Sequence, residues 1–266
     1  MRVRWEGVGF LTMVLFGAFP PKATCQEFDG PDGLFQVDGR SMVLHCSSGP
    51  PPTLVIDAGL GDSSEDWETI ALGVSTQAAV CIYDRPGYGE SEPGPLPRSP
   101  TANARDLRAL LNVAGVQPPY VIAGHSLGGL NAQAFWRLFP SDVAGMILLD
   151  PTPTPALIQE RFPDVWALVL ADVESLEAEA TEARGNPAVE AGRLDAMSSE
   201  YSETLRWAGL ADGPNTFGNL PLLVVAAGRP RPESLGTSAV AFQEFWINEN
   251  RLLAGRSTAG RVIVLD

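Results

Sequence analysis

Short apolar runs alternate with amphipathic stretches along most of the chain. The apolar runs, rich in β-branched residues, are 53–57, 78–83, 120–123, 145–149, 222–227 and 261–265. Such runs are typical of strands that are covered on both faces. Stretches with helical spacing of apolar residues are 101–113, 127–139 and 238–253. The alternation predicts an α/β fold with a mostly parallel central sheet flanked by helices.

Two segments depart from this alternation. Near the N-terminus, runs 34–38 and 41–46 flank Gly39 and Arg40, which predicts an antiparallel hairpin. Residues 153–217 are rich in Ala and Glu, show helical but no strand pattern, and are interpreted as an inserted helical lid whose charges form a solvated face. The core is then 33–152 and 218–266. The apolar residues that could cover a site, or simply hold the lid to the core, are Phe162, Trp166, Leu170, Leu205 and Trp207.

The N-terminus resembles a secretory signal. Two arginines precede an apolar run over 7–19, and small residues follow at 23–25. The run is too short to cross ~30 Å of hydrocarbon as a helix, so no stable membrane span is expected. We predict that 1–25 is a leader and that the protein is exported, periplasmic or secreted. A cytoplasmic protein is the alternative, because Glu6 and Lys22 fit a signal imperfectly.

Composition limits the classes of partner and cofactor that are expected. The 32 acidic and 18 basic side chains give a net charge of -14, which repels nucleic acid, so no nucleic-acid partner is expected. The three cysteines show no metal-ligand spacing, and neither a metal nor an organic cofactor is implied. Cys81 is interpreted as a buried small hydrophobic residue, while Cys25 and Cys46 could pair in an exported protein.

A G-x-S-x-G motif carries the candidate chemistry. It spans Gly124 to Gly128, directly after the run 120–123 and before the stretch 127–139. A serine on a sharp strand-to-helix turn is held in a strained backbone geometry, and the helix N-terminus points amide groups at the site. Ser126 is therefore predicted to be a nucleophile for acyl carbonyls.

With two further motifs, the chain from about Val37 to Asp266 resembles the α/β-hydrolase superfamily in its serine esterase and lipase-like branch. Ala58-Gly59-Leu60-Gly61 follows a strand where this family places an oxyanion donor. The resemblance implies that the backbone amides of Leu60 and Leu127 bind the oxyanion. The segment 84–91, DRPGYGES, resembles a family turn, and its Asp84 and Arg85 are interpreted as structural hydrogen-bonding partners.

The resemblance places the triad acid after one of two strands. Asp150 follows 145–149 and is the predicted acid. The loop after 222–227 contains no aspartate but does contain Glu233, which is the alternative. Asp150 could instead cap a helix or act as a lid hinge, and Glu233 could be an exposed loop charge.

A histidine base is harder to assign. The sequence holds two histidines, His45 and His125. His125 is expected to project away from Ser126, and His45 ends a strand far from the triad. In the resembling family the histidine follows the last central strand, here 261–265. We therefore expect that truncation has removed both the base and a closing helix, which would leave apolar surface exposed.

The sequence thus predicts a serine hydrolase for small-molecule carboxylic esters or related acyl substrates, impaired in the 266-residue chain. The alternative is a non-catalytic ligand-binding or interaction protein on the same scaffold. Lactone or perhydrolysis chemistry would keep the fold and change the reaction.

Overall fold

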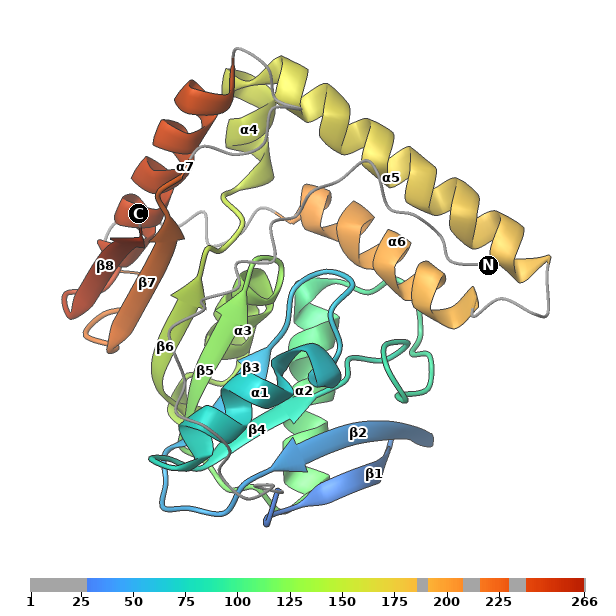
Figure 1. The fold of residues 1–266 in the computed structure, drawn as a ribbon, viewed down its shortest axis with the longest axis vertical. Coiled ribbons are helices and arrows are strands. Elements are labelled where there is room, and N and C mark those ends of the chain that lie inside the picture. Colours follow the sequence, from blue (N-terminus) through green and yellow to red (C-terminus); the bar gives the residue numbers. More distant parts are fainter. Residues whose placement is uncertain (1–27, 186–190, 208–215, 230–237, 266) are drawn as a thin grey trace.

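A single eight-stranded sheet organises the molecule (Figure 1). The computed structural model describes residues 28–185, 191–207, 216–229 and 238–265, so the leader 1–25 lies outside the described residues. The strand order is β1-β2-β4-β3-β5-β6-β7-β8. The strands are β1 (Asp32–Val37), β2 (Arg40–Cys46), β3 (Thr53–Asp57), β4 (Val80–Tyr83), β5 (Tyr120–His125), β6 (Val143–Leu149), β7 (Leu222–Ala227) and β8 (Gly260–Leu265).

The pairing of these strands confirms the predicted fold class. β1 and β2 form an antiparallel hairpin, and β2 pairs antiparallel with β4. All pairs from β4 across to β8 are parallel. The carboxyl ends of the parallel strands therefore meet at one edge of the sheet, which is where open α/β sheets build their sites.

Helices cover the sheet and fill the insertion. The core helices are α1 (Ser64–Ser75), α2 (Pro100–Val113), α3 (Gly128–Leu138) and α7 (Ala239–Ala254), with a 3₁₀ turn at Pro140–Asp142. The insertion contains α4 (Pro155–Arg161), α5 (Pro163–Arg184) and α6 (Ala191–Arg206). Figure 1 shows these three helices on the side of the sheet where β6 ends. No helix within the described ranges combines the length and hydrophobicity needed to cross a membrane.

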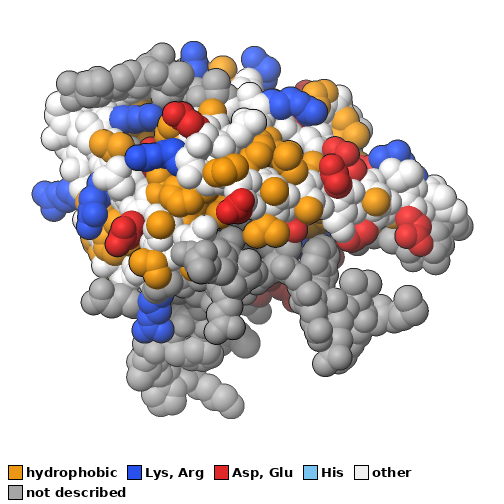
Figure 2. Space-filling view, turned by 90° about the horizontal axis from the view of Figure 1, so that it is seen from above, with side chains coloured by type: hydrophobic (Ala, Val, Ile, Leu, Met, Phe, Trp, Pro, Cys, Tyr) orange, Lys and Arg blue, Asp and Glu red, His pale blue; other side chains and the backbone are white. Residues whose placement is uncertain are grey.

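Aromatic residues hold the first part of the insertion to α7. The ring of Phe162 lies 5.2 Å from that of Phe242 and 5.1 Å from that of Phe245, and Trp166 packs against the same cluster. By contrast, Leu170 is 41% exposed. The face of the molecule seen in Figure 2 mixes hydrophobic side chains with acidic and arginine side chains. Phe162 and Trp166 therefore attach the insertion to the core.

Apolar side chains of β7 and β8 are partly exposed on one face of the sheet, as far as the described residues show. Leu223 and Val225 of β7 are half-buried, and Ile263 of β8 is 47% exposed. These residues lie on the sheet face that α1 covers farther along, because they continue the row of Ile147 and Leu149.

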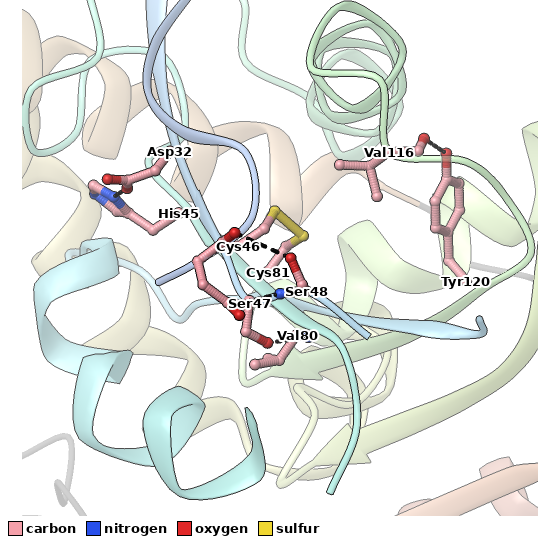
Figure 3. Close-up of a disulfide and its surroundings, with 10 residues drawn as sticks. Asp32, His45, Cys46, Ser47, Ser48, Val80, Cys81, Val116 and Tyr120 are labelled. Carbon is pink, nitrogen blue, oxygen red and sulfur yellow. Dashed lines mark hydrogen bonds and ion pairs between the residues drawn. A yellow bond between two sulfur atoms is a disulfide. The ribbon is translucent and has the colours of Figure 1, made fainter. Parts of the chain in front are cut away.

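A disulfide joins Cys46 of β2 to Cys81 of β4 (Figure 3). Cys81 is buried as expected, but it is disulfide-bonded, and its partner is Cys46, so the possible pairing of Cys46 with Cys25 is wrong. The antiparallel register places Cys46 directly opposite Cys81, with their Cα atoms 4.1 Å apart. Both residues are buried, and the bond crosses between strands that the sequence does not show to be neighbours.

We expect the Cys46→Ala/Cys81→Ala double variant to unfold more readily than the wild type. The bond closes a loop with a sequence separation of 35, for which loop-closure entropy gives a stabilisation of at most about 4 kcal/mol. Urea unfolding of both proteins, with and without a phosphine reductant, measures the loss. A reductant effect on the double variant equal to that on the wild type would contradict the assignment.

Candidate active site

Ser126 occupies a strained turn between β5 and α3. Its φ of +51° lies in the left-handed region, which costs a non-glycine residue roughly 1–2 kcal/mol. Its N–H donates to the carbonyl of Leu149 (3.0 Å), so β6 helps to hold the turn. A Cβ on Gly124 would lie 2.3 Å from the carbonyl oxygen of Gly128. The two glycines of the motif are therefore required by close backbone contact.

The loop 58–62, called the oxyanion loop below, lies directly against this turn. A Cβ on Gly128 would lie 2.6 Å from the carbonyl oxygen of Ala58. Neither the Leu60 amide nor the Leu127 amide donates a hydrogen bond to another residue within the described ranges. Both amides thus remain available for a negatively charged oxygen near Ser126.

Asp150 is fixed at the carboxyl end of β6. Its φ is +43°, a second non-glycine residue in the left-handed region. Its Oδ1 atom accepts hydrogen bonds from the backbone N–H of Ala227 (3.0 Å) and from the indole N–H of Trp246 (2.8 Å). The adjoining chain contacts the turn, because the N–H of Thr152 donates to the carbonyl of Ser126 (3.3 Å). The alternative acid, Glu233, lies outside the described residues.

The two histidines lie on different strands of the sheet, with β4 and β3 between β2 and β5. His125 packs on Trp67 with ring centroids 5.5 Å apart, and its Nδ1 lies 3.6 Å from an Asp62 oxygen. Although burial opposes the change, His125 and the Gly59 N–H lower the pKa of Asp62. His45 contacts Asp32 (2.5 Å, Figure 3) and lies opposite Ile82 of β4, so β4 and β3 separate it from β5 and Ser126.

A buried polar network lies behind the oxyanion loop. Arg85 contacts Asp57 of β3 (3.0 Å) and Glu200 of α6 (2.9 Å), and all three side chains are at most 2% exposed. Asp84 accepts from the N–H of Ser64 (2.7 Å). The structural interpretation of Asp84 and Arg85 is therefore confirmed.

The charges in this network depend on one another. Burial raises the pKa of the Asp57 carboxyl, although Arg85 and hydrogen bonds from Tyr83 and Asn131 act in the opposite direction. The contacts of Arg40, Arg98 and Asp106 extend the network, so that three guanidinium groups face three carboxylates. Paired charges of equal number allow such a network to be buried.

Glu200 is the residue that sequence reasoning missed. The insertion's charges were interpreted as a solvated face, which is wrong for Glu200 because it is 1% exposed. Neighbouring acidic residues such as Glu203 are on the same helix, so composition gives no sign of the difference. Glu200 can be buried because its carboxylate pairs with Arg85, which is distant in the sequence.

Two cavities lined by described residues lie away from Ser126. A space of about 30 Å³, room for about one water, is lined by residues of α3, α7 and 151–155. A second space of about 310 Å³ lies beside the disulfide, at the opposite edge of the sheet. Ser126 lines neither. No group of three or more metal-ligating side chains occurs in the part of the chain that the structure describes.

Comparison with known proteins decides the family. The sequence model of the alpha/beta hydrolase fold matches residues 52–192, more than half of the chain. The chain belongs to the α/β-hydrolase family. This match includes the oxyanion loop, the Ser126 turn, Asp150 and all of α5.

One curated relative and two solved structures match most of the length of this α/β hydrolase. It is 26% identical over 215 residues to the uncharacterized protein YqjL of Bacillus subtilis, covering 80% of the chain and 75% of that protein. A thermophilic esterase from Thermogutta terrifontis has a TM-score of 0.62 at 17% identity, covering 88% and 89% of the two chains. An enol-lactonase from Burkholderia xenovorans has a TM-score of 0.61 at 18% identity, covering 88% and 91%. The two structures support the fold.

Proposed function

We propose that this α/β hydrolase is a serine hydrolase for carboxylic esters or related acyl substrates, with Ser126 as its nucleophile. The observation that carries the proposal is the strained Ser126 turn beside two amides that bond to no described residue. Strained residues held by surrounding structure cluster at active sites, and paired amides are the donors that acyl transfer requires.

In the proposed reaction the Ser126 hydroxyl oxygen bonds to the acyl carbon while its proton passes to a base. The carbonyl oxygen becomes an oxyanion that accepts hydrogen bonds from the Leu60 and Leu127 amides. Collapse of this intermediate expels the alcohol, which takes a proton, and water then releases the acid from the serine. Asp150 is proposed as the group that orients the base, with Glu233 as the alternative.

The base limits the expected rate. His45 lies on β2, with β4 and β3 between it and β5, and His125 lies against Trp67 and Asp62. A serine without a positioned imidazole keeps only binding and oxyanion stabilisation, which leave a residual rate. The 266-residue chain is therefore expected to turn over far below the roughly 10 s⁻¹ that is typical of enzymes.

We expect added imidazole to restore part of the Ser126-dependent hydrolysis of p-nitrophenyl butyrate, because it can accept the serine proton from solution. The rate would be measured for the wild type, for Ser126→Ala, and for Ser175→Ala, a control on the exposed face of α5. Since imidazole itself cleaves the ester, the Ser126→Ala rate is the background to subtract.

Two results would contradict this expectation. Equal rates in the wild type and Ser126→Ala at every imidazole concentration would exclude Ser126 as the nucleophile. Ser126-dependent turnover of ordinary size without imidazole would show that a base is present, and loss of that turnover in His125→Asn would assign it to His125.

A second candidate is a non-catalytic binding protein on the same scaffold. This candidate is favoured because neither histidine lies where a base is expected to accept the proton of the Ser126 hydroxyl. This candidate predicts a stable fold and no labelling of Ser126 by a fluorophosphonate, whereas the hydrolase predicts slow labelling that Ser126→Ala abolishes.

Export of the protein is proposed on separate grounds. The Cys46–Cys81 disulfide supports it, because disulfides persist mainly in oxidising compartments. Fractionation of cells that produce the full chain, followed by mass measurement of the N-terminus, tests both export and removal of 1–25.

A further inference from the structure

Helix α6 of the insertion packs against the oxyanion loop. Arg193 donates to the carbonyl of Gly61 (2.6 Å). Leu60 packs against a buried cluster that includes Met197 of α6. The segment 84–91 also packs closely against α6, because a Cβ on Gly87 would lie 2.8 Å from the Cβ of Ala196. The loop and α6 therefore form one packed unit.

The charged Arg85 guanidinium donates hydrogen bonds to both the oxyanion loop and α6. Its Nη1 donates to the carbonyl of Ala58 and its Nη2 to the carbonyl of Gly59, each at 2.7 Å. On its other side, Nε donates to Glu200 Oε1 (2.9 Å). A planar guanidinium presents its donors in a fixed fork, so moving one partner moves the others.

The Gly59 contact bears directly on the proposed chemistry. The carbonyl of Gly59 and the N–H of Leu60 belong to the same peptide unit, which is planar and trans, so that the two groups point in opposite directions. A hydrogen bond that fixes the Gly59 oxygen on Arg85 therefore also fixes the direction of the Leu60 N–H. The positive charge at that oxygen polarises the peptide and strengthens the N–H as a donor.

Glu200 sets the position of the guanidinium. Its Oε1 also accepts from Asn103 (2.8 Å), and its Oε2 accepts from the hydroxyl of Tyr88 (2.6 Å). Both oxygens are thus occupied inside the protein, and the carboxylate is 1% exposed. A buried charge with these partners has one stable placement, because any other leaves it unpaired.

We infer that Glu200, acting through Arg85, is a positioning residue that aims the Leu60 amide at the oxyanion. This inference rests on the proposed function. It makes α6 a fixed support of the oxyanion loop, so the insertion contributes to the reaction rate.

The test compares Glu200→Gln with Asp106→Asn. Both remove a buried carboxylate charge of the same network, but Asp106 contacts Arg40 and Arg98 and does not contact the oxyanion loop. Under conditions of Ser126-dependent turnover, Glu200→Gln is expected to lower kcat about tenfold to a hundredfold with KM within about twofold, since misaimed oxyanion donors act on the transition state. Asp106→Asn is expected to keep kcat. Equal losses of kcat in both variants would overturn the inference.

A second readout separates this inference from the proposed function. The ¹⁵N amide resonance of Leu60, assigned by the peak that Leu60→Met removes, should shift in Glu200→Gln and stay in place in Asp106→Asn. If the wild type shows no Ser126-dependent hydrolysis, the proposed function fails while this resonance still decides the inference. An unchanged Leu60 resonance in Glu200→Gln would overturn it. If Glu200→Gln does not fold, Tyr88→Phe removes one Glu200 hydrogen bond at constant shape, and the same shift is expected at smaller size.

Discussion

Replacing Arg85 by methionine is expected to lower the free energy of unfolding by about 3–5 kcal/mol, because it leaves buried charges without a partner. Asp57 and Glu200 are both 1% exposed and both contact the Arg85 guanidinium. The carbonyls of Ala58 and Gly59 lose their donors as well. Methionine fills similar space, so the effect reports charge and hydrogen bonding more than lost volume. Urea unfolding at neutral pH measures it.

The loss in Arg85→Met should be smaller in acid. Burial already raises the pKa of Asp57, and removal of Arg85 takes away a group that lowers it. A carboxyl whose pKa is higher in the folded than in the unfolded protein adds stability at low pH, and that stability is lost as the pH rises through the folded-state pKa. The difference between the wild type and Arg85→Met should therefore shrink below neutral pH. A pH-independent difference would show that the carboxylates are not the cause.

Arg206→Met provides the matched control. The Arg206 side chain is 70% exposed and contacts Glu203 at 3.0 Å, three positions earlier on the same helix. Exposed pairs of this kind contribute at most about 1 kcal/mol because water screens them. Similar losses in Arg206→Met and Arg85→Met would contradict the importance assigned to the buried network.

Local pattern is sufficient to predict the sheet and the strand-to-helix turn that carries Ser126. The apolar runs 53–57 and 222–227 coincide with β3 and β7, and the other predicted strands differ from the observed ones by a few residues at their ends. Ser126 was found because its motif sits between a strand and a helix, a context that five residues and their flanks encode. Helix α1 was missed because its buried face consists of Ser64, Trp67 and Ala71, too few apolar positions for a helical period to stand out.

Local sequence pattern could not predict contacts between segments that are far apart in the sequence. The Cys46–Cys81 bond depends on β2 lying beside β4, and the sequence does not state strand order. Glu200 and Arg85 are 115 positions apart, and their pairing depends on how α6 docks. A charged residue on a helix is normally solvated, so only the buried partner identifies Glu200 as different. The parts of the site that sequence reasoning missed are those that tertiary packing creates.

Gly128→Ala is expected to remove Ser126-dependent hydrolysis and to lower the free energy of unfolding by about 3 kcal/mol, at the upper end of ordinary overpacking. The new Cβ would lie 2.2 Å from the carbonyl oxygen of Asp57 and 2.6 Å from that of Ala58. Both atoms are backbone, so no side chain can turn away to make room. Either α3 or the oxyanion loop must shift, and each carries one of the two proposed oxyanion donors. Misplacing one by about 1 Å is enough for a large loss of rate.

Gly73→Ala is the same substitution where space is open. Gly73 lies in the last turn of α1, and a Cβ there would meet no atom within 4 Å. Since alanine is the better helix former, this variant should gain about 0.5–1 kcal/mol and keep its activity. Urea unfolding and p-nitrophenyl butyrate hydrolysis of both variants make the comparison. A Gly128→Ala protein that matches Gly73→Ala in both measurements would show that the turn can widen, and that close backbone contact does not hold Ser126 in its strained conformation.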